Sequence, residues 1–141
     1  MITEDYVPLY VAELLKEKGF DEPCRFIYDD GRLCSVASRD LRWNEGYGEL
    51  VEESSNSELS GTDRVCAPTL YIAMKWLRET HGIFININVG WRDAEQVVPE
   101  YGWWVERLYS AKHHVRGMVA VENTYKDACN AAIMYCLEKL V

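Results

Sequence analysis

Residues 67–89 carry two hydrophobic periods in succession, and this change constrains the fold more than any other feature of the chain. Residues 68–79 follow the helical period, and Gly82 interrupts that pattern. The run FININV at 84–89 then alternates apolar and polar residues, as a half-buried strand does. A helix that leads directly into such a strand predicts a mixed fold in which helices cover one face of a sheet.

The flanking segments extend this pattern in both directions. A first helix is expected from Pro8, which suits the first helical position, to Gly19, which suits the left-handed residue that ends a helix. A hairpin over 24–37 turns at Asp30-Gly31 and pairs Tyr28 with Leu33. Strands over 101–109 and 115–121 and a last helix from Thr124, with Asp127 completing its cap, are also predicted.

The element order is therefore αββ, a loop, and αβββα, which predicts an α+β fold whose antiparallel sheet carries its helices on one face. A chain of 141 residues can bury the core of one such domain. We expect a single domain over 1–141, made of a helix and hairpin at 8–37, an acidic variable loop at 38–66 and an αβββα unit at 67–141.

Charge limits the classes of partner. The 23 acidic residues outnumber the 15 basic ones, which gives a net charge of -8 and disfavours nucleic-acid phosphates and anionic lipid. Acidic residues concentrate between positions 44 and 63, where no basic residue occurs. This segment is interpreted either as a solvated loop or as a binding site for a basic partner, and its candidate residues are Glu45, Glu49, Glu52, Glu53 and Glu58.

The five cysteines do not follow a metal-binding or disulfide pattern. No pair has CxxC spacing, and the hairpin register places Cys24 and Cys34 on opposite sides of the ribbon. Cys129 and Cys136 fall on one face of the last helix, where small core residues are the preferred interpretation. We expect reduced thiols, no metal and no cofactor, and no apolar run reaches the roughly 18 residues that span a membrane.

The sequence contains no recognisable catalytic motif. Phosphate-binding loops, zinc-protease helices and esterase elbows are all absent. His113 and His114 are adjacent in an expected turn, and no carboxylate is placed to orient them. His81 precedes Gly82, where a cation would favour the negative end of the helix dipole. The chain is therefore predicted not to be an enzyme.

Trp103 and Trp104 are the strongest candidates for a binding surface. Consecutive strand residues point to opposite faces of a sheet, so one ring belongs to the core and the other lies on the second face. By alternation, that second face is expected to carry residues from the set Asn86, Asn88 and Arg116. The sequence does not decide whether the N-terminal hairpin, a protein partner or a second copy of the chain covers this second face.

Three blocks carry a resemblance to a known family. The run LLKEKGFDEPC at 14–24, the block at 67–79 and the ending TYKDA at 124–128 resemble a family of small uncharacterised proteins encoded on bacteriophages and mobile elements of gut bacteria. That family has no assigned activity. The resemblance implies a bacterial cytoplasmic setting and transfers no catalytic residue.

The αβββα order of residues 68–140 is also similar to that of a double-stranded-RNA-binding domain. This family grips phosphates with lysines at the start of its last helix. Here the corresponding position carries Lys126 between Glu122 and Asp127. The sequence thus favours a non-enzymatic, acidic interaction protein with a protein partner, such as an inhibitor of a host or defence protein, and keeps a nucleic-acid-binding module as the alternative.

Overall fold

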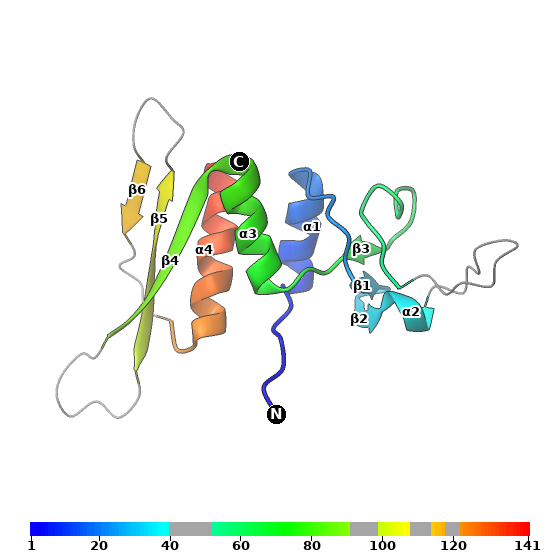
Figure 1. The fold of residues 1–141 in the computed structure, drawn as a ribbon, viewed down its shortest axis with the longest axis horizontal. Helices are drawn as coiled ribbons and strands as arrows, with labels where there is room; N and C mark the ends of the chain where they lie inside the picture. The colour runs from blue at the N-terminus through cyan, green and yellow to red at the C-terminus, as the bar shows by residue number, and fades with distance from the viewer. Residues whose placement is uncertain (40–51, 91–98, 108–113, 118–121) are drawn as a thin grey trace, which may run out of the picture. The chain divides into compact units, whose positions relative to one another are not determined.

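The computed structural model describes residues 1–39, 52–90, 99–107, 114–117 and 122–141 (Figure 1). Its contacts group into two compact units, Met1–Thr69 and Leu70–Val141, which are described separately below. The mixed helices and antiparallel sheets confirm the predicted α+β class. The elements are α1 (Leu9–Glu17), β1 (Phe26–Asp29), β2 (Arg32–Ser35), α2 (Val36–Arg39), β3 (Val65–Cys66), α3 (Leu70–His81), β4 (Ile83–Gly90), β5 (Glu100–Arg107), β6 (His114–Gly117) and α4 (Tyr125–Lys139).

Helix α1 follows its predicted limits closely. Pro8 precedes its first residue, and Gly19 adopts a φ of 95° after its last turn. The amide of Phe20 returns to donate to the carbonyl of Leu15 at 2.9 Å, and the Phe20 ring is buried. A glycine is needed at this point because other residues adopt positive φ at a cost.

The hairpin forms in the predicted register, but its second strand ends at Ser35, and Val36–Arg39 form helix α2 instead of continuing the strand to 37. Asp30 and Gly31 both adopt positive φ, at 52° and 75°, as the tight turn of a twisted two-residue hairpin requires. Tyr28 consequently lies opposite Leu33. A short strand that the sequence analysis did not predict, β3, pairs with the other side of β1 and gives the strand order β2-β1-β3.

The described part of the predicted acidic loop, residues 52–66, is packed into the first unit. Asn56 is buried, donates from Nδ2 to the Phe20 carbonyl at 2.8 Å, and accepts at Oδ1 from the Cys66 amide at 3.0 Å. Leu59 is also buried. A solvated loop was the expectation because Ser and Asn are usually exposed, but their short side chains also bond buried backbone groups.

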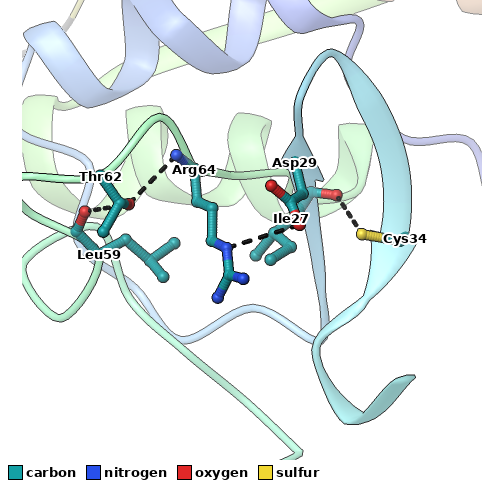
Figure 2. A network of polar contacts seen from close by, with 6 residues as sticks. All are labelled: Ile27, Asp29, Cys34, Leu59, Thr62 and Arg64. Carbon is teal, nitrogen blue, oxygen red and sulfur yellow. Dashed lines mark hydrogen bonds and ion pairs between the residues drawn. The ribbon is translucent and has the colours of Figure 1, made fainter. Parts of the chain in front are cut away.

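An ion pair ties this segment to the hairpin. Arg64 Nε lies 3.6 Å from Asp29 Oδ2, and both side chains are roughly a third or less exposed (Figure 2). The backbone leading to it is fixed by Thr62, whose hydroxyl donates to the Leu59 carbonyl at 2.6 Å and accepts from the Arg64 amide at 3.2 Å. The end of β1 and the approach to β3 are thus held together.

The second unit is an antiparallel meander, β4-β5-β6, with α3 and α4 packed on one face (Figure 1). Gly82, with a φ of 65°, turns α3 into β4. Thr124 accepts from the Asp127 amide at 3.0 Å, which confirms the predicted cap of α4. Small residues on α4 face the core, as predicted, and include Ala128, Cys129, Ala132 and Cys136.

The far end of α4 is capped by a side chain from the sheet. Arg107 Nη1 on β5 donates to the Leu140 carbonyl at 2.7 Å, where unpaired carbonyls and the helix dipole favour a cation. His81 has a pKa below its ordinary value, because it is partly buried and because Arg107 adds positive charge. Arg107 therefore places a cation at the end of α4. At the end of α3, a charged His81 was expected from the sequence, but burial disfavours the charged form of this side chain.

Candidate interaction surface

The pairing of β4 with β5 sorts their side chains between two faces. Ile85 lies opposite Val105 and Ile87 opposite Trp103, and this set faces α3 and α4. The residues between them point away from the helices. We call this second set the helix-free face, and it consists of Phe84, Asn86, Asn88, Glu100, Gly102, Trp104 and Glu106.

The two consecutive tryptophans have different environments. Trp103 is 6% exposed, and its ring centroid lies 5.5 Å from that of Tyr135 on α4. The buried Trp103 Nε1 has no hydrogen-bond partner among the described residues. Trp104 is 42% exposed although it belongs to the central strand of the sheet. The alternation predicted from the sequence is present, and the structure identifies Trp104 as the ring on the helix-free face.

Trp104 has an amide and a carboxylate side chain beside it on the helix-free face. Asn86 lies directly opposite it on β4, and Phe84 lies opposite Glu106 one row further along. Directly opposed residues of an antiparallel pair are close enough for their side chains to touch. The described side chains of this face thus combine aromatic rings, amides and carboxylates, and none of them is basic.

Asn88 lies over a glycine in the row beyond Asn86. A Cβ atom built on Gly102 would lie 2.7 Å from Asn88 Oδ1, closer than real contacts allow. The glycine therefore makes room for the Asn88 amide against the sheet.

The contact between Gly102 and Asn88 predicts coupling between substitutions at the two positions. Gly102→Ala should displace the amide in the native background, whereas in an Asn88→Ala background the added methyl group meets no such atom. We expect a coupling free energy of roughly 0.5–1.5 kcal/mol from a double-mutant cycle measured by urea unfolding. Additive effects, within about 0.3 kcal/mol, would contradict this contact.

The other candidate residues are not among the described side chains of this face. Arg116 on β6 pairs with Val105, whereas Trp104 pairs with Gly117. The Arg116 side chain lies outside the described residues, as do Glu45 and Glu49. The remaining acidic candidates, Glu52, Glu53 and Glu58, belong to the first unit and are exposed.

Local partners occupy two of those three carboxylates. Glu53 Oε1 lies 3.7 Å from Arg25 Nε in an ion pair that is largely exposed, at 54% and 73% respectively. Such a pair contributes little to stability. Glu58 Oε1 accepts a hydrogen bond from the Ser55 hydroxyl at 3.3 Å. The carboxylates remain on the surface, so the segment keeps its negative charge.

A pair of thiols that the sequence analysis did not combine meets in the first unit. The neighbouring Cys66 side chain raises the pKa of the Cys24 thiol, and burial raises it further. Ser54 connects both residues, because its carbonyl accepts from the Cys24 amide at 2.8 Å and from Cys66 Sγ at 3.3 Å. A buried thiol with a raised pKa stays protonated, so Cys24 is a poor nucleophile or metal ligand. Their separation along the chain offers no motif that could have revealed the pair.

Thiol labelling should distinguish these cysteines from the half-buried Cys34. Iodoacetamide reacts with exposed thiolates, whereas Cys24, Cys66, Cys129 and Cys136 are buried, and burial raises the pKa of Cys136 to about 12. We expect one fast reaction in the folded protein, assigned to Cys34 by mass spectrometry and removed by Cys34→Ser. Fast labelling of a second position would show that the folded state exposes another thiol.

The described residues contain no cluster of three or more potential metal ligands. None of the helices found among them has the length and apolar character needed to cross a membrane. No family model, curated protein or solved structure matches the chain significantly.

Proposed function

We propose that this chain is a non-enzymatic protein-binding module whose contact surface is the helix-free face around Trp104. The observation that supports the proposal is a tryptophan that is 42% exposed on the central strand of a sheet. Tryptophan is among the residues that dominate binding energy at protein interfaces. Exposure of such a ring in the middle of a sheet face is typical of a contact surface rather than of a solvated edge.

The chemistry of the surface favours a basic partner. Glu100 and Glu106 lie on the same face of β5 as Trp104, and the whole chain has a net charge of -8. An arginine side chain can stack its guanidinium plane on an indole ring and pair with a nearby carboxylate. We therefore expect a partner segment that contains arginine, with the acidic surface accelerating its approach.

The biological setting is part of this proposal. The resemblance to phage- and element-encoded proteins supports a role in the bacterial cytoplasm, against a host or defence protein. Glu52, Glu53 and Glu58 would add long-range attraction for the same basic partner. In its sharpest form, the protein is an inhibitor whose acidic groups compete for a nucleic-acid-binding site on that partner.

Capture from a bacterial lysate tests the proposal and locates the surface. The full chain is compared with Trp104→Ala and with a Glu52→Gln, Glu53→Gln and Glu58→Gln triple variant. Neutralisation is preferred to deletion because Asn56 and Leu59 in this segment belong to the core. Loss of the partner with Trp104→Ala supports the proposal. Loss with the triple variant alone would move the site to the acidic segment.

The topology of the second unit supports one alternative, a nucleic-acid-binding module. Its αβββα order with both helices on one face is the arrangement expected of a double-stranded-RNA-binding domain. Against this, the start of α4 carries Lys126 next to Asp127 and after Glu122. A gel shift with duplex RNA at low salt separates the two, because phosphate binding would weaken steeply as salt is added.

A further inference from the structure

The outer edge of the second sheet lacks the features that usually prevent strands from pairing between molecules. Strand β4, Ile83–Gly90, is eight residues long and contains no charged residue and no proline. It is the edge strand in the order β4-β5-β6, and no strand among the described residues pairs with its outer side. Natural edge strands are usually shortened, charged or interrupted, because their free amides and carbonyls attract another strand.

The exposed end of β4 adds apolar surface to this edge. Val89 belongs to the row that faces the helices, yet it is 58% exposed. Ile85 and Ile87 in the same row are half-buried. Within the described part of the chain, the outer side of β4 therefore has no strand partner, and an exposed apolar side chain lies at one end.

We propose that β4 pairs antiparallel with the β4 strand of a second copy of this chain, across a two-fold axis at Ile87. In this register Ile87 meets its own copy and Ile85 meets Val89, so apolar residues meet on the helix side. On the other side Asn86 meets Asn88, and Phe84 covers Gly90. Each row thus joins chemically compatible side chains, and Val89 gains an apolar neighbour.

The identity of the occupant follows from this self-complementarity. A two-fold axis at a residue and perpendicular to the sheet keeps the helices of both copies on the same side of one continuous six-stranded sheet. A charged peptide would gain no ion pair from β4, because this strand has no charged residue. In a second copy, the apolar and amide residues of β4 pair with the same residues of the first copy, and no like charges meet. The two helix-free faces would then lie side by side, although the dimer does not depend on what those faces bind.

A charge-swap experiment on the full chain tests this register. One variant carries Asn86→Lys with Asn88→Lys, and the other carries Asn86→Asp with Asn88→Asp. In either homodimer, positions 86 and 88 meet with like charges in two rows, so the dimer dissociation constant should rise at least about tenfold. Mixing the two variants brings opposite charges together and should restore a dimer, observed by size exclusion with light scattering.

A control variant separates this effect from a change in net charge. Tyr10→Lys with Tyr71→Lys adds two positive charges, as the lysine variant of β4 does, but at exposed helical positions. This control should leave the dimer intact. Circular dichroism verifies that each variant is folded. A wild-type chain that stays monomeric over a wide range of concentrations would overturn the proposal, and so would a dimer that is insensitive to both β4 variants. Loss of dimerisation without recovery in the mixture would reject the β4 pairing.

Discussion

Trp104→Ala is expected to weaken binding of the captured partner by at least about 30-fold, the loss typical of a central aromatic contact at an interface. The ring lies on the middle strand, 42% exposed, opposite Asn86. Removing it takes away the exposed aromatic ring that a partner side chain would cover. Isothermal titration with the purified partner measures the change.

The controls for this prediction use the same type of side chain. Tyr71→Ala removes another exposed aromatic, on α3, and should leave the affinity unchanged. Trp104→Phe should retain more affinity than alanine because a ring remains. Since Trp104 is 42% exposed, more than half of its large ring is buried, so Trp104→Ala should cost roughly 2–3 kcal/mol in the free energy of unfolding, and circular dichroism verifies that the variant is folded. Equal loss of affinity in the Tyr71 and Trp104 variants would contradict the assigned surface.

Asn56→Ala is expected to reduce the free energy of unfolding by about 2–3 kcal/mol, which is large for a residue in a Ser-rich segment. The side chain is 6% exposed and bonds two backbone groups, the Phe20 carbonyl and the Cys66 amide. Alanine leaves both groups without this partner and opens a small cavity. Urea unfolding followed by circular dichroism measures the loss.

Two further variants identify the cause of that loss. Ser60→Ala changes an exposed side chain in the same segment and should alter stability by less than about 0.5 kcal/mol. Asn56→Asp keeps the size and the acceptor for Cys66, but it replaces the donor to Phe20 with a buried negative charge. It should therefore destabilise at least as much as alanine near neutral pH. If Asn56→Ala left the free energy of unfolding unchanged, the segment would not be part of the core.

Local signals predicted most elements of both units, but not α2 or β3. The positive φ of Gly19, the turn at Asp30-Gly31 and the cap at Thr124 depend on residues within a few positions of each other. Those signals were sufficient to predict the α+β class and the hairpin register. The same reasoning missed β3, because a strand of two residues has too few side chains to show a period.

The environment of the acidic segment could not be predicted in the same way. Composition treats Ser54, Asn56 and Leu59 as parts of a polar loop. Their burial depends on carbonyls and amides of residues far away in the chain, such as Phe20 and Cys66. The proximity of the Cys24 and Cys66 side chains has the same origin, since sheet pairing between β1 and β3 brings distant parts of the chain together.

The two tryptophans of the candidate surface separate what the sequence determined from what only the tertiary structure determined. Alternation by itself determined that Trp103 and Trp104 lie on opposite faces, because successive strand side chains must diverge. It did not determine which ring is core. Trp103 is the core ring because Tyr135 of helix α4 packs against it, and Trp104 therefore lies on the face without helices. Backbone geometry fixes alternation locally, whereas the choice of buried face depends on which side the helices return to after the chain has turned.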